Sequence, residues 1–172
     1  QAHAAVDMML SDNALGDAGA RVVIEEFLEG EEASFIVMVD GKHVLPLATS
    51  QDHKRLKDND EGPNTGGMGA YSPVPWLDDA EALVDAIHKP VVGELSRRGT
   101  PFVGCLYAGL MMTHDGPRVL EFNARFGDPE TQPIMLRLQS DLVDLVEAAL
   151  DGRLDSVQAR WDRRPSLGVV MA

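Results

Sequence analysis

The sequence is poor in cysteine and in positive charge, and each shortage argues against a class of protein. A single cysteine, Cys105, excludes an intrachain disulfide framework and argues against a zinc cluster. We expect it to be a small buried apolar side chain. Fifteen Lys and Arg against 28 Asp and Glu give a net charge of −13, which opposes binding to nucleic acid or to an anionic membrane. A local basic pocket for a phosphorylated metabolite stays compatible with that charge.

Long hydrophobic runs and several catalytic signatures are also missing. No window has the apolar length of a transmembrane helix or the pattern of a signal peptide, so we expect a cytoplasmic protein. The sequence has no Walker loop, no dinucleotide-binding fingerprint and no nucleophile elbow. The chain has 172 residues, of which 44% are hydrophobic and 25% are charged. This length and composition are typical of a globular protein with one core or two small lobes. The chain starts at Gln1 and stops inside an apolar run, from which we expect a piece of a larger protein.

The first third of the chain has the pattern of a helix followed by strands. Periodicity predicts a helix over 3–10, and β-branched residues predict a strand over 21–28. Two apolar runs flank Asp40-Gly41, which is a hairpin signal. We therefore expect residues 21–50 to form a small antiparallel meander.

Further along, helical and strand signals alternate. We expect a helix over 78–98 that Pro90 kinks or splits, and a helix over 132–151 that breaks near Ser140 and Asp141. A second hairpin and a last strand are expected from apolar runs over 102–113, over 117–123 around Asp115-Gly116, and from Leu167 onward.

The polar segment 51–75 is too long for an ordinary connection, which points to function or to disorder. Its "QDHKR" places His53, Lys54 and Arg55 together in an acidic chain, either as phosphate-binding charge or as a basic surface turn. Its "NTGGMG" at 64–69 has clustered glycines, which let backbone N–H groups approach an anion or form a flexible loop.

Two acidic stretches carry the remaining signals. "EEFLEGEEASF" at 25–35 is either a solvated turn or a place where backbone groups bind a purine while a carboxylate accepts from two ribose hydroxyls. "VLEFNARFGDPETQ" at 119–132 places Glu121, Asn123 and Arg125 on one face of a strand, with Leu120 and Phe122 expected to point into a core. A solvated strand face is the alternative. Carboxylate and amide oxygens together are hard ligands that suit Mg²⁺.

Taken in this order, "VIEEFLEGEEASF", "QDHKR" with "GPNTGGMGAYSP", and "EFNARFGDPETQ" resemble the glycinamide ribonucleotide synthetase family of the ATP-grasp superfamily. The resemblance covers essentially the whole chain. It implies an α+β ATP-grasp fold, with antiparallel sheets flanked by helices and the nucleotide held between two lobes. It also implies the C-terminal part of the small lobe at 1–50, the large lobe at 51–166, and the start of a further domain at 167–172.

The resemblance implies a reaction in which ATP phosphorylates glycine to glycyl phosphate. The amine of 5-phosphoribosylamine then attacks, giving glycinamide ribonucleotide, ADP and phosphate in purine biosynthesis. The implied partners are these small molecules, without nucleic acid or membrane, in a monomer or weak dimer. Residues 1–172 alone are expected to be inactive, because a "GLAAGKG"-like phosphate loop is absent. The alternatives are another ATP-grasp carboxylate–amine ligase and a non-catalytic nucleotide-binding module.

The family's functional positions can be carried over to this sequence by motif. The resemblance assigns the metal, Mg²⁺ or Mn²⁺, to Glu121 and Asn123, while Ala108 stands where many ATP-grasp enzymes carry another carboxylate. It assigns ATP binding to Glu25, Glu26, Phe27 and Leu28 of the hinge and, for the ribose, to Glu32. It assigns catalysis to Lys54, Arg125 and Asp128, and substrate binding to Asp52, Arg55, Asn64, Thr65, Gly66, Gly67, Met68, Gly69, Gly127 and Pro129.

Overall fold

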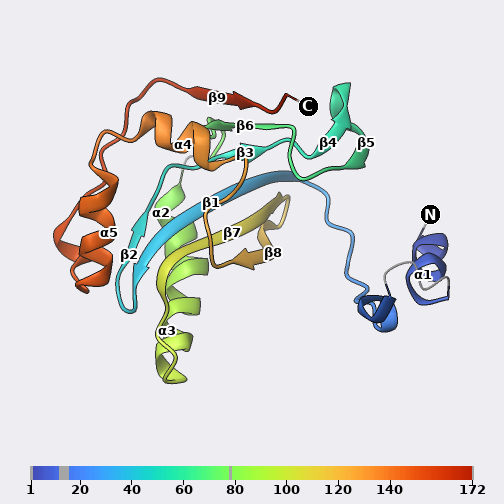
Figure 1. Ribbon diagram of the computed structural model, residues 1–172, viewed down its shortest axis with the longest axis horizontal. Helices are drawn as coiled ribbons and strands as arrows, with labels where there is room; N and C mark the ends of the chain where they lie inside the picture. The colour runs from blue at the N-terminus through green and yellow to red at the C-terminus, as the bar shows by residue number, and fades with distance from the viewer. Residues whose placement is uncertain (1, 12–15, 78, 172) are drawn as a thin grey trace.

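A four-stranded antiparallel sheet forms the centre of the protein, and its strands come from two hairpins (Figure 1). The computed structural model describes residues 2–11, 16–77 and 79–171. Both predicted Asp-Gly turns are confirmed, because Gly41 and Gly116 adopt φ of +94° and +109°, which only glycine accepts freely. In spatial order the strands are β2 Val44–Pro46, β1 Glu31–Asp40, β7 Val103–Thr113 and β8 Gly116–Asn123.

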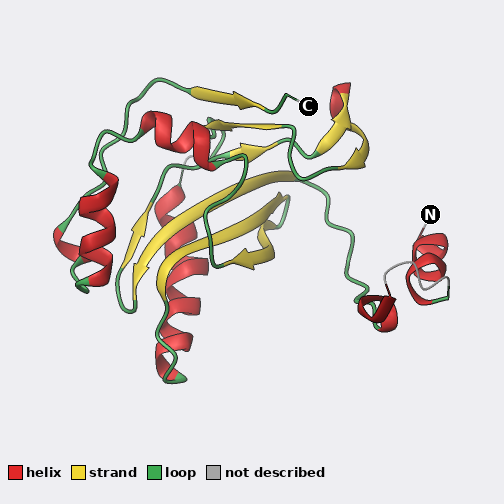
Figure 2. Ribbon diagram, viewed as in Figure 1, coloured by secondary structure: helices red, strands yellow, loops and turns green. Residues whose placement is uncertain are grey.

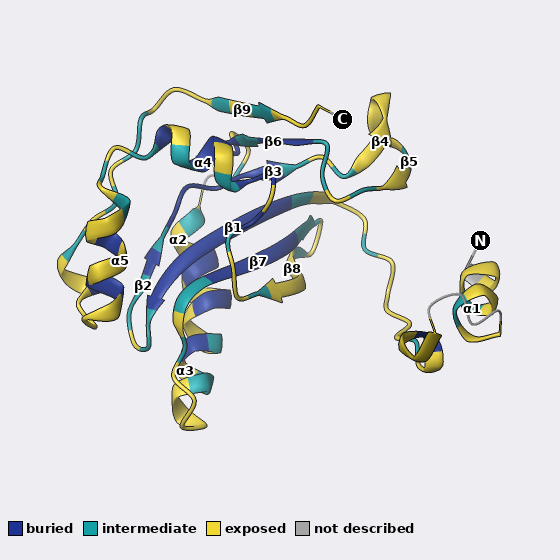
Figure 3. Ribbon diagram, viewed as in Figure 1, coloured by how far each residue is buried: buried dark blue, intermediate teal, exposed yellow. Residues whose placement is uncertain are grey.

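Helices cover both faces of this sheet, so β1 is buried along nearly its whole length (Figures 2 and 3). On one face, Phe35, Val37 and Val39 pack against Leu83, Val84, Ile87 and Val92. These four come from α2 Ala80–Leu83, a π-helical turn Val84–His88 and α3 Lys89–Arg97. On the other face, Ile36 and Met38 pack against α4 Thr131–Arg137 and α5 Leu142–Leu150.

The two predicted helix interruptions are confirmed. Pro90 has no N–H, and the turn before it widens so that the Lys89 N–H donates to the Val84 carbonyl five residues back. At the second interruption, the Asp141 carboxylate accepts from the Val143 N–H and caps α5. Residue 78, where the helix predicted over 78–98 was expected to start, lies outside the described residues.

The segment predicted as a long loop holds short strands. A three-stranded sheet joins residues near 51, near 70 and near the C-terminus, which confirms the last predicted strand. Its strands are β3 Gln51–Asp52, β6 Gly69–Ser72 and β9 Ser166–Val169, and a separate ribbon pairs β4 Arg55–Lys57 with β5 Glu61–Asn64. The remaining elements are α1 Ala2–Leu10, which confirms the first predicted helix, and short 3₁₀ turns at Gly16–Ala20, Asp58–Asp60 and Leu154–Ser156.

Two predictions about strands are wrong. Residues 21–28 are not a strand, and Val23, Ile24 and Phe27 are 81–85% exposed. A strand needs a neighbour for its backbone groups, and no strand in the described part of the chain lies beside this segment, so the meander reduces to β1 and β2. Leu120 and Phe122 do not enter a core but remain about 40% exposed, because β8 is the last strand of its sheet. None of the described helices is long and apolar enough to cross a membrane.

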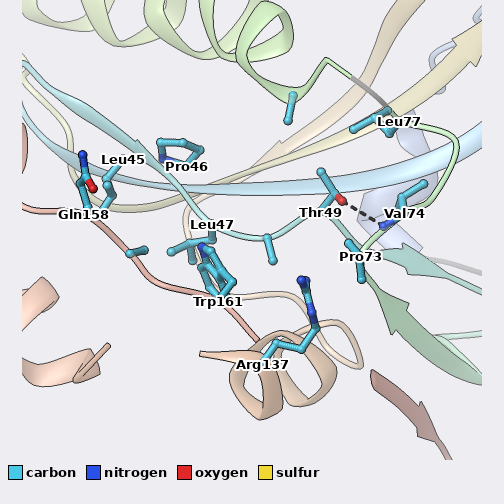
Figure 4. A pocket seen from close by; sticks show the side chains of 13 residues that line it. Leu45, Pro46, Leu47, Thr49, Pro73, Val74, Leu77, Arg137, Gln158 and Trp161 are labelled. Atoms are coloured by element: carbon cyan, nitrogen blue, oxygen red, sulfur yellow. Dashed lines mark hydrogen bonds between the residues drawn. The ribbon is translucent and has the colours of Figure 1, made fainter. Parts of the chain in front are cut away.

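A hollow of about 510 Å³ lies between β2 and the segment that follows α5 (Figure 4). Leu45, Leu47 and Trp161 give it an apolar wall, and Arg137 lies at its edge. The Arg137 guanidinium is buried and donates to the Asp162 carbonyl at 2.9 Å and to the Ser72 hydroxyl at 2.9 Å. These bonds tie the chain after α5 to α4 and β6.

A buried histidine makes the stability of this fold sensitive to acid. His88 is fully buried, its Nε2–H donates to the Phe35 carbonyl at 3.3 Å, and its ring stands edge-on to the Phe35 ring. Burial lowers the pKa of His88 below its ordinary value, despite that hydrogen bond. The unfolded chain therefore takes up the proton more readily than the folded one. The free energy of unfolding is highest above the ordinary histidine pKa, and it falls as the pH drops from that value toward the lower pKa of the folded state.

We expect His88→Leu to be less sensitive to acid than the unchanged chain. Each pH unit between the two pKa values costs the unchanged chain about 1.4 kcal/mol, and leucine removes that term. The measurement is urea unfolding at pH 7 and pH 5, with the exposed His114→Leu as the control. An equal loss of stability on acidification in both variants would contradict the prediction.

Candidate functional site

One face of the sheet changes from apolar to polar along β1, and the candidate site lies at the polar end. Ser34 faces Gly109 on β7, which faces Glu121 on β8. In the next row, Ile36 faces Tyr107, which faces Asn123. Residues directly opposite one another in antiparallel strands share a face. Glu121 and Asn123 therefore lie on the face that carries Ser34 and Tyr107, and away from the helices α2 and α3.

Gly109, which lies on β7 between Ser34 and Glu121, makes room for the Glu121 side chain. A methyl group at Gly109 would come within 3.2 Å of the Glu121 Cγ and 3.4 Å of a Tyr107 ring carbon. Among the described residues, no group of three or more His, Cys, Asp or Glu side chains could hold a metal ion. One carboxylate and one amide fit Mg²⁺ only as part of an oxygen shell that phosphate and water complete.

Lys54 and Glu32, which the resemblance assigns to the phosphates and to the ribose, contact each other. The Lys54 Nζ donates to a Glu32 carboxylate oxygen at 3.0 Å, and both side chains are partly exposed. Burial acts to lower the pKa of Lys54, but the hydrogen bond and charge of Glu32 raise it above the ordinary value. Lys54 is therefore a cation, and a ligand that uses both groups must separate them.

A cleft of about 600 Å³ is lined by both the hinge, residues 25–28, and the basic segment, residues 53–55. Its lining includes the predicted ATP-binding residues Phe27, Leu28 and Glu32, and the predicted catalytic and substrate residues Asp52, Lys54, Arg55 and Asn64. Glu25 and Glu26 are exposed and lie outside this lining. Arg55 is exposed as well, and its guanidinium donates to the Gly62 carbonyl at 2.8 Å.

The glycine loop at 64–69 uses several of its own amides, so its role as an anion cradle is narrower than expected. The Thr65 N–H donates to the Lys54 carbonyl at 2.7 Å, and the Met68 N–H donates to the His53 carbonyl at 2.7 Å. The Gly67 N–H donates to the Thr65 hydroxyl at 3.1 Å. Gly69 is buried where β6 pairs with β9, and a methyl group placed on Gly66 would have no neighbour within 4 Å. The loop is thus held against the basic segment.

The turn that follows β8 divides its predicted residues into two groups. Arg125 and Asp128 are exposed: Arg125 donates to the Phe126 carbonyl at 2.9 Å, and Asp128 accepts from the Gln132 amide at 2.9 Å. Gly127 and Pro129 are buried under the site instead. The turn therefore presents two charged side chains outward from a packed base.

Glu130, for which the sequence predicts no role, is the buried anion of this base. It is only 3% exposed, and its Oε1 accepts from the Ser34 hydroxyl at 2.8 Å and from the Tyr107 hydroxyl at 3.1 Å. A glutamate after a Gly-Asp-Pro turn is typical of a solvated helix start, so no local signal marks it as buried. Ser34 and Tyr107 lie on strands, and no residue near them in the sequence indicates that they contact Glu130.

Asp52 is a second carboxyl group of the site, and it is only partly buried. Its Oδ1 is buried, and no hydrogen-bond donor from the described residues reaches it. Burial and then the negative charge of Glu130 raise the pKa of Asp52 to about 6, against the opposing charge of Lys54. Asp52 is therefore ionised at neutral pH and takes up a proton as the pH falls through about 6.

Sequence comparison matches residues 1–131 to the family model described as "Phosphoribosylglycinamide synthetase, ATP-grasp (A) domain". Curated relatives named phosphoribosylamine–glycine ligase come from Xylella fastidiosa, 66% identical over 176 residues, and Neisseria meningitidis, 63% identical over 175 residues. Both alignments cover the whole of this chain but only 40% and 41% of the relatives, so the chain spans about two fifths of their length.

Solved structures agree on the fold. The phosphoribosylamine–glycine ligase of Thermotoga maritima superposes with a TM-score of 0.74 at 34% identity, over 84% of this chain and 37% of that one. N5-carboxyaminoimidazole synthetase of Staphylococcus aureus, at a TM-score of 0.58 and 14% identity over 83% of this chain and 35% of that one, shares the fold alone. The predicted ATP-grasp fold of antiparallel sheets and helices is confirmed. Residues 1–131 match the ATP-grasp domain of the phosphoribosylglycinamide synthetase family, and the chain belongs to that family.

Proposed function

We propose that this chain is the nucleotide- and substrate-binding part of an ATP-dependent ligase that joins glycine to 5-phosphoribosylamine. The products are glycinamide ribonucleotide, ADP and phosphate, with glycyl phosphate as the intermediate. The observation that carries the proposal is that Lys54 and hinge residues line one cleft, and that Glu121 lies near enough for its charge to help raise the pKa of Lys54. The names of the relatives supply the substrates.

Each predicted group has a role that its surroundings allow. Hinge residues around Leu28 line the cleft, where their backbone can contact a purine, and Glu32 can accept from the ribose hydroxyls. Lys54, released from Glu32, would neutralise phosphate charge. Glu121 and Asn123 would hold Mg²⁺ or Mn²⁺, and the metal, when bound, supplies charge neutralisation at the phosphates.

The outward-facing charges after β8 complete the proposal. Arg125 is free to swing toward an acyl phosphate, since its present bond is to a neighbouring carbonyl on the surface. Asp128 and the loop at 64–69 stay assigned to the substrates as predictions. Five further points stay predictions as well. They are a cytoplasmic location, the use of Mg²⁺ or Mn²⁺, a monomeric or weakly dimeric state, the domain boundaries at residues 50 and 166, and the inactivity of residues 1–172 alone.

The experiment is a substrate panel with the full-length ligase that carries this segment. We expect ADP release to require both glycine and 5-phosphoribosylamine, with aspartate or bicarbonate unable to replace glycine. ADP release that requires another acid would favour a different ATP-grasp ligase. ATP binding without turnover on any member of the panel would favour a nucleotide-binding module.

A further inference from the structure

Three buried oxygen atoms form a closed triangle beside the proposed metal site. The Glu130 Oε1 lies 2.8 Å from the Ser34 hydroxyl and 3.1 Å from the Tyr107 hydroxyl, and the two hydroxyls lie 2.9 Å apart. All three residues are at most 4% exposed. Each hydroxyl carries a single hydrogen. Because both hydroxyls donate to Glu130, both hydrogens are used within the triangle.

Tyr107 lies next to the two side chains that are proposed to hold the metal. It faces Asn123 across the pair of strands β7 and β8, and Gly109 in the adjacent row faces Glu121. A methyl group at Gly109 would lie 3.7 Å from the Tyr107 Oη and 3.2 Å from the Glu121 Cγ. The Tyr107 hydroxyl and the Glu121 side chain therefore share the space over this glycine.

The Tyr107 hydroxyl keeps its hydrogen at neutral pH. Burial first, and then the negative charges of Glu130 and Glu121, raise the pKa of Tyr107 above its ordinary value, against the hydrogen bond with Ser34. Tyr107 is therefore a buried donor that needs an acceptor. Glu130 receives its hydrogen bond, whereas Glu121 acts on it through charge.

A hydrogen bond from Tyr107 to Glu121 would compete with a metal ion, since a lone pair that accepts a hydrogen cannot also coordinate a cation. The nearby side-chain donors are bonded to other acceptors. Ser34 and Tyr107 donate to Glu130, and Lys54 donates to Glu32 at 3.0 Å. This arrangement leaves the oxygen atoms of the proposed metal pair to the cation.

Resting on the proposed metal-dependent ligase function, we propose that Glu130 is a positioning residue for the metal pair. It accepts the hydroxyl hydrogens of Ser34 and Tyr107 and so keeps these donors away from Glu121 and Asn123. Glu130 acts through the two hydroxyls and does not itself coordinate the metal. Because it stands at the start of α4, the same contacts hold that helix against β1 and β7.

The test measures what the metal contributes to ATP binding, without turnover. Calorimetry with the full-length ligase gives the dissociation constant of ATP in EDTA and in Mg²⁺, both without glycine, and the first divided by the second is the metal ratio. Glu130→Met keeps the length of the side chain but loses the carboxylate acceptor. We expect it to lower the metal ratio about tenfold or more, as is typical of a hydrogen bond to a charged group, with the EDTA constant within about threefold.

Removing the released donor should restore the metal ratio. When Glu130→Met is combined with Tyr107→Phe, the hydroxyl that would turn toward Glu121 is gone, and we expect the ratio to return to within about threefold of the unchanged value. A merely structural role of Glu130 would give no such rescue, because the second substitution deletes another buried polar contact of the same network.

Glu147→Met, which changes an exposed glutamate in the same way, is the control and should leave the metal ratio unchanged. Where Glu130→Met does not fold, Glu130→Ala with and without Tyr107→Phe takes its place. An unchanged ratio in the single variant, or a ratio that stays low in the double variant, would overturn the proposal. Failure of the proposed function looks different, since the unchanged ligase would then release no ADP in response to glycine and 5-phosphoribosylamine.

Discussion

Replacing Glu121 and Asn123 together by alanine is expected to lower ATP turnover by the full-length ligase about 1,000-fold or more. Phosphoryl transfer depends on positioning and on neutralising charge, and these two side chains are the oxygen donors that the polar face of the sheet offers to a metal. Both lie on β8, opposite Gly109, which makes room for the Glu121 side chain, and Tyr107, whose hydroxyl donates to Glu130. The measurement is steady-state ADP release at saturating glycine and 5-phosphoribosylamine.

Two controls separate loss of metal binding from loss of structure. Glu147→Ala removes a carboxylate from the exposed side of α5 and should leave turnover within about twofold, as is usual for surface positions. Glu121→Gln keeps the shape of the side chain, so its thermal midpoint should match that of the unchanged enzyme while turnover falls. Turnover of the double variant within tenfold of the unchanged enzyme would refute the metal assignment.

Gly67→Ala is expected to reduce kcat/KM for the amine substrates about 100-fold, because a displacement of about 1 Å at a site can cost that much. Gly67 has φ of +118°, where side chains are strained, and a methyl group there would meet the Asp52 Oδ1 at 2.8 Å. The loop at 64–69 would have to lift away from Pro129 and Asp52. Thermal unfolding should show a loss of stability as well, because alanine at a positive φ is strained.

The neighbouring glycine provides the matched control for this loop. A methyl group on Gly66 would meet no atom within 4 Å, so Gly66→Ala should retain kcat/KM within about threefold. Equal losses in the two variants would show that flexibility of the whole loop, rather than contact at Gly67, limits the reaction. Full activity of Gly67→Ala would refute the packing of this loop against Asp52 and Pro129.

Local signals predicted most elements of the fold. The Asp-Gly turns of both hairpins, the cap at Asp141 and the break before Pro90 were predictable because each depends on residues adjacent in the chain. The absence of a strand at 21–28 was not, since strand formation depends on a partner that sequence patterning does not specify. The exposure of Leu120 and Phe122 likewise depends on the position of β8 at the sheet edge.

By itself, the sequence determined the family, the alternation that puts Glu121 and Asn123 on one face, and the glycines that the turns require. Only the tertiary structure decided that Glu130 is buried beneath Ser34 and Tyr107, and that Asp52 retains an oxygen without a donor among the described residues. The reason is physical: backbone alternation and turn geometry are local properties, whereas the burial and charge state of a carboxyl group depend on residues distant in the chain. Ser34 and Glu130 are 96 residues apart, and only folding makes them neighbours.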